Sequence, residues 1–281
     1  MGNFQAPRIM GIINCTPDSF YAGSRFSAEE AIVECAEKMI AEGADIIDIG
    51  GESTRPGAAA VSAGEQIART VPAIRAIREI SSIPISIDTQ SAAVAEAALN
   101  AGAGIINDIS ALRTDARMLK LAAERGVLVV LMHIQGTPET MQKNPRYNNV
   151  VAEVRDYLRK AADMALAGGV REEHIILDPG IGFGKRPMDN VMLLKNLSSL
   201  RTGNFPLLVG LSRKSFLGVI LDGSNEAQSG KAVSRMPDER LVGTIAAHAW
   251  CLTQGVDILR VHDVKEARDL IAVWEAFECP S

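Results

Sequence analysis

The sequence predicts an α/β protein, a single (β/α)8 TIM barrel that takes in the whole chain, residues 1–281. Short apolar runs alternate with amphipathic helical segments from one end to the other. The apolar runs end on average about 35 residues apart, the length of one strand–helix–strand step. No Pro- or Ser-rich linker interrupts the series. Eight parallel strands in one chain of this length favour a closed barrel over the alternative, an open doubly wound sheet.

Eight segments are expected to be the strands of this barrel. They are rich in β-branched residues, nearly all apolar, and end in polar residues, as strands buried on both faces do. The segments are Ile9–Asn14, Ile46–Gly50, Ile85–Asp88, Ile105–Asn107, Val127–His133, Ile175–Asp178, Leu207–Leu211 and Ile258–His262.

The segments between these strands carry helical patterns. One helical face has i, i+3, i+4, i+7 spacing and is formed by Ala31, Ile32, Cys35, Ala36, Met39 and Ile40. Three capping boxes predict helix starts: Ser27 with Glu30, Ser62 with Glu65 and, as a looser variant, Asp263 with Glu266. The polar segment Asp222–Met236 follows the seventh strand and is expected to be a loop insertion.

The composition restricts the class of protein. A formal net charge of −5 argues against a nucleic-acid partner, and no apolar run approaches the roughly 18 residues of a membrane span. The cysteines Cys15, Cys35, Cys251 and Cys279 have no C-x-x-C spacing and are expected to be reduced thiols. The first residues have no charged-then-apolar leader. We therefore expect a cytoplasmic protein that binds neither nucleic acid nor a membrane.

Polar side chains stand at the ends of the predicted strands. Because a (β/α)8 barrel places its active site at the C-terminal ends of its strands, they are expected to surround one site. A carboxylate after a strand can instead cap the next helix, and we favour that interpretation for Asp108 and Asp263. It fits Asp88 and Asp178 less well. Asp178 is followed by Pro-Gly and not by a helix, and the residues after Asp88 can cap the next helix themselves. The strand-end residues are Asn14, Asp48, Asp88, Asn107, His133, Asp178, Ser212–Lys214 and Arg260–His262.

Arg260 and His262 lie two residues apart on the last strand, so their side chains point to the same face. In a closed barrel this strand pairs with the first, which brings both near Asn14. An arginine, a histidine and an amide oxygen suit an oxyanion together with a hard divalent metal. The alternative is that Arg260 pairs with a core carboxylate such as Asp48; we favour the anion site.

Two glycine-containing loops complete the predicted rim. Gly50–Gly57 contains Arg55 and is expected to cover the substrate. In Asp178–Lys185 the glycine spacing does not fit a dinucleotide fingerprint, and the loop is expected to present Phe183 as an apolar wall. Lys214 could also be a solvated surface lysine. Together Arg55, Lys185, Arg213, Lys214, Arg260 and His262 predict a positive rim that binds an anion, a phosphate ester.

These motifs, in this order, resemble the dihydropteroate synthase family, and the resemblance extends from about Arg8 to the last helix. They are Ile13–Phe20, Gly50–Gly57, Ile87–Thr89, Asn107–Asp108, Leu131–His133 with Gln135–Pro138, Leu177–Lys185, Ser212–Ser215 and Arg260–Asp263. The resemblance implies a transferase of folate biosynthesis that joins a pterin methyl diphosphate to 4-aminobenzoate and releases diphosphate. It also implies a homodimer, and inhibition by sulfonamides as mimics of 4-aminobenzoate.

The resemblance assigns roles residue by residue. It implies catalytic roles for Asp88, Lys214, Arg260 and His262. It implies that the pterin diphosphate is bound by Thr54, Arg55, Asp88, Asn107, Met132, Asp178, Phe183, Lys214, Arg260 and His262, with Asn14 on Mg²⁺. The pocket for 4-aminobenzoate would be formed by Phe20, Thr54, Pro56, Phe183, Lys214 and Ser215. The implied mechanism is a substitution with cation-like character at the pterin methylene, in which metal and cationic residues stabilise the departing diphosphate.

Two features depart from the family pattern, and other functions stay open. The first loop reads Tyr21–Ser24 where the family has Ser-Asp-Gly-Gly, and the insertion 222–236 is longer than usual. The altered loop keeps a non-catalytic pterin-binding paralogue as an alternative. A second alternative is a pterin-dependent corrinoid methyltransferase. It would need neither Ser212–Ser215 nor the loop around Arg55, so the presence of both argues against it. A phosphate-binding barrel lyase is the general alternative for this fold, and the absence of a strand-end Schiff-base lysine weighs against it.

Overall fold

Eight parallel strands form one sheet in the computed structural model, which describes residues 6–15, 28–55, 57–223 and 235–278. The order of the strands is β6-β5-β4-β3-β2-β1-β8-β7. The strands are β1 Arg8–Asn14, β2 Ile46–Gly50, β3 Ile85–Asp88, β4 Ile105–Asp108, β5 Leu128–Met132, β6 Ile175–Asp178, β7 Leu208–Val209 and β8 Ile258–Val261. All eight were expected, within two residues at each end.

The sheet closes on itself as the sequence predicts. The last strand, β8, pairs with β1 in parallel, with Met10 opposite Arg260. Between β6 and β7 the ladder is reduced to an isolated parallel bridge, Leu177 opposite Leu207, supported by a bond from the Leu177 N–H to the Pro206 carbonyl at 2.9 Å. Because this junction is so short, β7 spans Leu208–Val209 and not the expected Leu207–Leu211.

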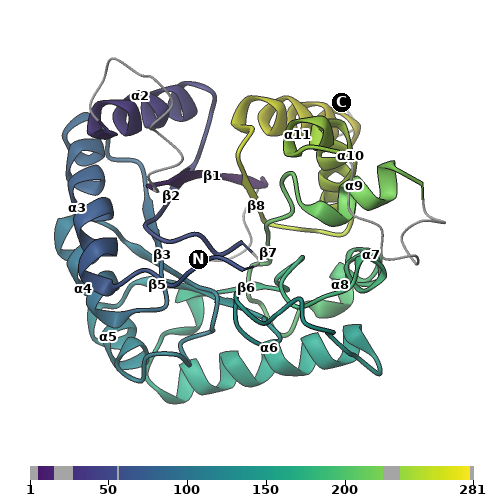
Figure 1. Cartoon of the computed structure of the whole chain (residues 1–281), viewed down its shortest axis with the longest axis horizontal. Coiled ribbons are helices and arrows are strands. Elements are labelled where there is room, and N and C mark those ends of the chain that lie inside the picture. The colour runs from purple at the N-terminus through teal and green to yellow at the C-terminus, as the bar shows by residue number, and fades with distance from the viewer. Residues whose placement is uncertain (1–5, 16–27, 56, 224–234, 279–281) are drawn as a thin grey trace.

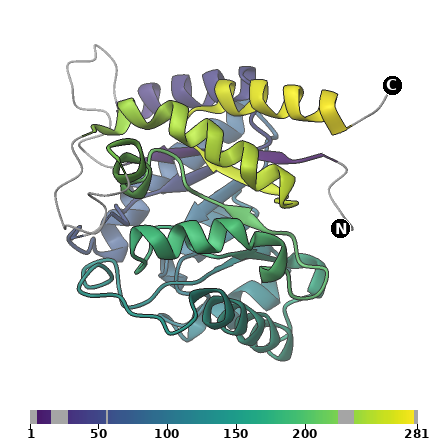
Figure 2. The ribbon, with the colours of Figure 1, turned by 90° about the vertical axis from the view of Figure 1, so that its right-hand side faces the viewer.

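Helices surround the strands as a ring (Figures 1 and 2). They are α2 Ala28–Ala41, α3 Ala63–Ile80, α4 Ala92–Ala101, α5 Arg117–Arg125, α6 Val150–Ala167, α7 Pro187–Lys195, α8 Leu197–Leu200, α9 Ser215–Leu221, α10 Leu241–Thr253 and α11 Val264–Glu278. Ile32, Ala36 and Met39 of the predicted helical face are buried on α2. No helix within the described ranges is both long enough and apolar enough to cross a membrane.

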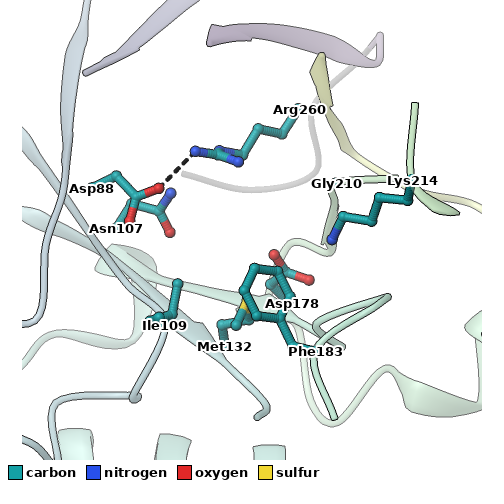
Figure 3. Close-up of a pocket in the computed structure, with 9 residues that line it drawn as sticks. All are labelled: Asp88, Asn107, Ile109, Met132, Asp178, Phe183, Gly210, Lys214 and Arg260. Atoms are coloured by element: carbon teal, nitrogen blue, oxygen red, sulfur yellow. Dashed lines mark hydrogen bonds and ion pairs between the residues drawn. The ribbon is translucent and has the colours of Figure 1, made fainter. Parts of the chain in front are cut away.

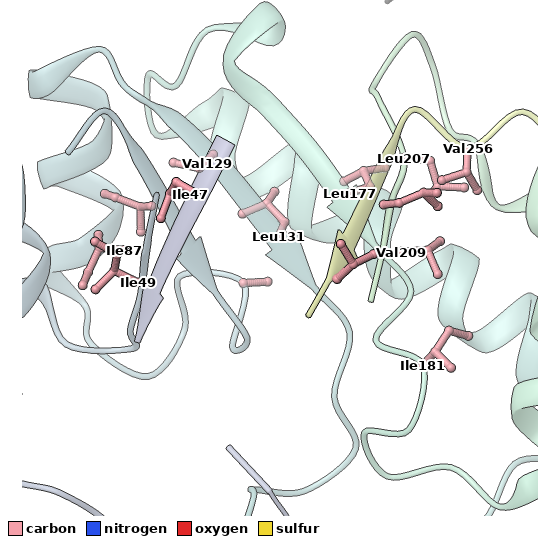
Figure 4. Packing of buried hydrophobic residues seen from close by; sticks show 14 of the residues in the cluster. Ile47, Ile49, Ile87, Val129, Leu131, Leu177, Ile181, Leu207, Val209 and Val256 are labelled. Carbon is pink, nitrogen blue, oxygen red and sulfur yellow. The ribbon is translucent and has the colours of Figure 1, made fainter. Parts of the chain in front are cut away.

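The two-residue period of the strands creates two separate packing layers. Side chains that point outward, such as Ile47, Ile87 and Leu131, pack in the large cluster between the sheet and the helices (Figure 4). A second cluster is formed by Met10, Ile46, Ile105, Val130, Ile176, Leu208 and Ile258, with Leu128 packed against it. These residues come from seven of the eight strands and alternate with outward-pointing neighbours, so they fill the barrel interior. The residues two positions further along these strands point into the same interior, nearer its C-terminal end.

The expected helix caps are partly confirmed. Ser62 accepts a hydrogen bond from the Glu65 N–H at 3.3 Å at the start of α3. The expectations for Asp263 and Asp108 are wrong. Asp263 accepts two bonds from the Arg213 guanidinium, at 2.6 and 3.0 Å, so an ion pair occupies its carboxylate. Asp108 accepts from the Ser110 and Leu112 N–H groups in the loop after β4, well before α5. Ser27 lies outside the described residues.

The described cysteines are free thiols, as expected. Cys15 and Cys251 are buried and Cys35 is half-buried. Burial raises the pKa of both Cys15 and Cys251 to about 12, so neither is a reactive thiolate at neutral pH. Cys279 lies outside the described residues. The three described thiols therefore serve as small apolar groups in the packing.

Truncation of the inner layer should destabilise the barrel strongly. Ile258 is fully buried in that layer, whereas Ile80, at the end of α3, is 44% exposed. We expect Ile258→Ala to lower the free energy of unfolding by about 2–5 kcal/mol, because it removes buried methyl groups and leaves a cavity. The control Ile80→Ala should change it by less than about 1 kcal/mol. Urea denaturation followed by circular dichroism measures both; equal effects would contradict the burial of Ile258 in the inner layer.

Candidate active site

A pocket opens at the C-terminal end of the barrel interior (Figure 3). Its lining consists of Asp88, Asn107, Ile109, Met132, Asp178, Phe183, Gly210, Lys214 and Arg260. The structure thus brings together seven residues that the family resemblance assigned to the pterin, from five strands and two loops. Ile109 and Gly210 were missed. Gly210 could have been found, because it lies two residues after the inward-pointing Leu208 and so points into the pocket.

The strand period explains why polar groups gather in this pocket. Asp48, Asn107 and Asp178 each lie two residues after an inner-layer residue of the same strand, and Arg260 follows Ile258 in the same way. Alternate residues of a strand share a face, so the polar group of each strand stands directly above its apolar plug. The barrel interior is therefore apolar at one end and carries converging charges at the other.

Arg260 links two carboxylates in this interior. Its Nε donates to Asp48 Oδ2 at 2.6 Å and its Nη2 to Asp88 Oδ2 at 2.7 Å. Asn107 Nδ2 donates to the same oxygen of Asp48 at 3.1 Å. Pairing of Arg260 with a core carboxylate is the interpretation that we did not favour from the sequence. In the structure it is realised, and Arg260 is not a free anion-binding group.

The carboxyls that face the pocket titrate unusually. Burial raises the pKa of Asp88 to about 7; Arg260 opposes this rise, and the negative charge of Asp48 adds to it. Burial also raises the pKa of Asp178. The Gly180 N–H, which donates to Asp178 Oδ1 at 2.7 Å, opposes this rise. In its ionised form, each carboxylate can accept hydrogen bonds from N–H groups of a flat heterocycle.

Lys214 faces these carboxyls from the loop after β7. Its ammonium donates to the Ile181 carbonyl and lies 4.3 Å from the centroid of the Phe183 ring. Figure 3 shows it on the side of the pocket where Asp178 also points inward. Burial lowers the pKa of Lys214 to about 7, with Asp178 opposing this change. Lys214 is therefore part of the pocket and not a solvated surface lysine.

Lys185 does not contribute to a positive rim, contrary to the sequence-based expectation. It is only 2% exposed, and its Nζ lies 2.9 Å from His133 Nδ1 and 2.8 Å from the Gly180 carbonyl. Burial lowers its pKa well below the usual value. His133 is likewise buried and packs edge-on against Tyr157, so it points away from the pocket, and burial lowers its pKa to about 2.

Arg213 and His262 also add less positive charge to the rim than expected. The Arg213 guanidinium is paired with Asp263 and Asp238. Burial lowers the pKa of His262 to about 4, and the positive charges of Arg260, Arg213 and Arg55 lower it further. A histidine with this pKa is neutral at pH 7, and its Nδ1 lies 3.1 Å from Ser212 Oγ. Arg55 and Lys214 are thus the rim cations for which the structure describes no carboxylate partner.

The remaining predicted residues lie around the mouth or outside the described part of the chain. Thr54 is half-buried and Arg55 exposed in the loop after β2, and Ser215 is exposed at the first position of α9. None of these three lines the pocket. Phe20, Pro56 and the altered segment Tyr21–Ser24 lie outside the described residues, as does 224–234 of the insertion.

The residues present can hold Mg²⁺ only together with an anionic ligand. Across the described residues, no group of three or more His, Cys, Asp or Glu side chains is placed to bind a metal ion. Mg²⁺ bound to substrate phosphates, however, often needs only one or two protein ligands. The amide oxygen of Asn14 is a hard ligand of this kind at the end of β1. A Cβ built on Gly50 would lie 3.8 Å from it and 3.6 Å from Asp88 Cβ, so Asn14 borders the pocket.

Comparison with known proteins gives the same assignment along nearly the whole chain. Residues 10–262 match the family model described as pterin binding enzyme. The chain is 45% identical over 268 residues to the dihydropteroate synthase of Synechocystis sp., covering 95% of this chain and 89% of that one.

Solved structures agree with this relationship. The structure of Xanthomonas albilineans dihydropteroate synthase with 4-aminobenzoic acid superposes with a TM-score of 0.89 at 40% identity, covering 99% of this chain and 95% of that one. The Yersinia pestis dihydropteroate synthase in a sulfonamide drug complex gives a TM-score of 0.88 at 39% identity, covering 97% and 94%. The chain therefore belongs to the pterin binding enzymes and, among them, to the dihydropteroate synthase family.

Proposed function

We propose that this chain condenses (7,8-dihydropterin-6-yl)methyl diphosphate with 4-aminobenzoate, giving 7,8-dihydropteroate and diphosphate. The observation that carries the proposal is the convergence of Asp88, Asn107, Asp178 and Lys214 around one pocket under the Phe183 ring. A pterin edge presents amino and ring N–H donors beside oxygen and nitrogen acceptors. Two carboxylates, an amide and a lysine supply the complementary acceptors and donors.

The apolar residues of the pocket suit the faces of the pterin ring. Met132 and Ile109 belong to a small buried cluster against which Phe183 packs. Gly210 lines the same pocket, and a Cβ at this position would lie 3.6 Å from Arg260 Cβ. The absence of a side chain at Gly210 therefore leaves space for the pterin ring beside the arginine. A flat heterocycle between these groups and the charged rim would be held with its exocyclic methylene toward the mouth.

In the proposed reaction the amino nitrogen of 4-aminobenzoate attacks the pterin methylene carbon. The bond from that carbon to the diphosphate oxygen breaks, and the diphosphate leaves with the electron pair. The nitrogen then loses a proton to water or to the departing diphosphate. Positive charge that develops on the pterin is offset by Asp88 in its ionised form, which Arg260 holds in place at 2.7 Å.

The diphosphate would lie at the mouth, beside Arg55 and His262. Arg55 is exposed and His262 is neutral at pH 7, so these two supply one full charge and one hydrogen-bond donor. Mg²⁺, held by Asn14 and the substrate, would neutralise charge on the leaving diphosphate. We propose that Thr54, Ser215, Phe183 and Lys214 contact 4-aminobenzoate, together with Phe20 and Pro56. That the related Yersinia pestis protein was solved with a sulfonamide drug supports sulfonamides as competitors.

We propose that the protein works in the cytoplasm. Its described cysteines, Cys15, Cys35 and Cys251, are free thiols, which is typical of a reducing compartment. Fractionation of cells that produce the chain checks this location.

An assay of the purified protein tests the proposed reaction. With Mg²⁺ and both substrates we expect 7,8-dihydropteroate by chromatography, and no product after chelation by EDTA. Asp88→Asn should lower kcat/KM by about 10- to 100-fold, because a neutral amide replaces a charged acceptor; Ile80→Ala, remote from the site, serves as the control. A sulfonamide should raise the apparent KM for 4-aminobenzoate. Binding of the pterin diphosphate without turnover would instead identify a non-catalytic paralogue.

The pH dependence of stability should reveal the buried position of Lys214. Its pKa falls from 10.5 to about 7 on folding, so between these values the unfolded chain holds more protons than the folded one. Stability from this group therefore rises with pH across that window. We expect the free energy of unfolding of the wild type, relative to Lys214→Met, to increase from about pH 7 to about pH 10 in urea titrations. A difference independent of pH would show that Lys214 is solvated.

We propose a homodimer formed through helices on one side of the barrel. Large apolar side chains are exposed there: Met188 and Met192 on α7, Ile220 on α9, Val242 and Trp250 on α10, and Val273 and Phe277 on α11. Trp250 Nε1 donates to the Leu194 carbonyl at 2.8 Å, which places α10 against α7. Exposed apolar area that is shared between neighbouring helices is typical of subunit interfaces.

Light scattering checks the dimer. We expect a mass of about twice the 30.0 kDa of one chain. Val242→Asp should shift the mass toward the monomer, because it places a charge in the interface, whereas Ile80→Asp on α3 should leave it unchanged. A wild-type mass of one chain would refute the proposal.

A further inference from the structure

Lys185 is a buried lysine that the proposed reaction does not use. It lies at the end of the loop after β6, is 2% exposed, and does not line the pocket. Its Nζ donates to the carbonyls of Gly180 at 2.8 Å and Phe183 at 3.0 Å, and it lies 2.9 Å from His133 Nδ1. The carbonyl of His133 is a fourth, longer contact at 3.4 Å. No carboxylate among the described residues forms an ion pair with it.

These contacts join two loops that approach each other very closely. His133 follows β5, whereas Gly180 and Phe183 follow β6. A Cβ on Gly180 would collide with the His133 carbonyl oxygen, and the φ of +64° at Gly180 also requires glycine. The Nζ of Lys185 supplies the donors that the converging carbonyl groups need in this buried position.

The loop that Lys185 fixes carries two elements of the pocket wall. The Gly180 N–H donates to Asp178 Oδ1 at 2.7 Å and so orients that carboxylate. The Phe183 ring forms one side of the pocket and packs beneath the ammonium of Lys214 at 4.3 Å. Lys185 therefore bonds to the carbonyl groups of the two residues that set the positions of the Asp178 carboxylate and the aromatic wall.

We infer that Lys185 is a positioning residue for the pterin site, which acts by holding the Gly180–Phe183 backbone so that Asp178 and Phe183 meet the ring. This inference rests on the proposed function of the pocket. Without Nζ the Phe183 carbonyl would lose this donor, and the Gly180 carbonyl would keep the Phe183 N–H at 3.0 Å but lose the closer bond. The loop would then move to reach water, and it would carry the aromatic wall and the support of Asp178 with it.

Lys185→Met tests this role, because methionine keeps the length and apolar stem but has no donor. We expect the Kd of 6-hydroxymethyl-7,8-dihydropterin, measured by calorimetry, to rise about 10-fold. The KM for the pterin diphosphate should rise in parallel, with a smaller change in kcat. Lys185→Gln keeps two N–H donors near the same position and should recover part of the binding, to within about threefold of the wild type.

Ile77→Ala separates positioning from stability. Ile77 is fully buried on α3 near the opposite end of the barrel, so this variant should lower Tm yet keep the wild-type Kd. If Lys185→Met binds the pterin as tightly as the wild type, or if Ile77→Ala weakens binding equally at matched Tm, Lys185 serves stability alone and the inference is wrong.

Two further comparisons keep the test decisive. If Lys185→Met does not fold, His133→Leu removes one partner of Nζ, and His133→Asn keeps an acceptor near the position of Nδ1. Weaker pterin binding by His133→Leu than by His133→Asn supports the inference, and equal binding overturns it. Failure of the proposed function is distinguishable, because the wild type itself would then bind no pterin or form no product.

Discussion

The active end of this barrel depends on the sharing of Arg260 between Asp48 and Asp88. Asp48 is fully buried, and an unpaired carboxylate there would carry a large desolvation penalty. The guanidinium compensates it at 2.6 Å and, through a second nitrogen, fixes Asp88 at 2.7 Å. Asn107 Nδ2 donates a hydrogen bond to the same oxygen of Asp48. These contacts join β8, β2, β3 and β4, so one arginine holds Asp88 directly and supports Asn107 through Asp48.

The same strand period provides both stability and function. The strands β4 to β8 each contribute an apolar side chain to the inner plug and, two residues later, a residue to the pocket lining, as Ile258 and Arg260 do on β8. The plug excludes water from beneath the site, and hydrogen bonds to charged groups are stronger where water is excluded. A change of register by one residue would exchange these groups with the outer layer, so the register of each strand sets both the plug and the pocket.

The charge of the rim differs from what a count of basic residues suggests. Arg213 is neutralised by Asp263 and Asp238, Lys185 is enclosed between two loops, and the low pKa of His262 leaves it uncharged at pH 7. Attraction of a diphosphate would then rest on Arg55, on Lys214 and on a metal ion brought with the substrate. Several basic residues instead serve the architecture: they fix the loops that present Lys214, Phe183 and Asp178.

The sequence alone determined the eight strands, the parallel barrel and the family, because strand periodicity and the local motifs are properties of short segments. It also identified most of the pocket, since residues at the C-terminal ends of parallel strands must converge. Only the tertiary structure decided which charges are free. Arg213 meets Asp263 50 residues away and Arg260 meets Asp48 212 residues away. Pairing and burial decide whether a charged side chain is available to a ligand, and both depend on distant segments. No local pattern could therefore show that Lys185 faces inward or that Arg260 is already paired.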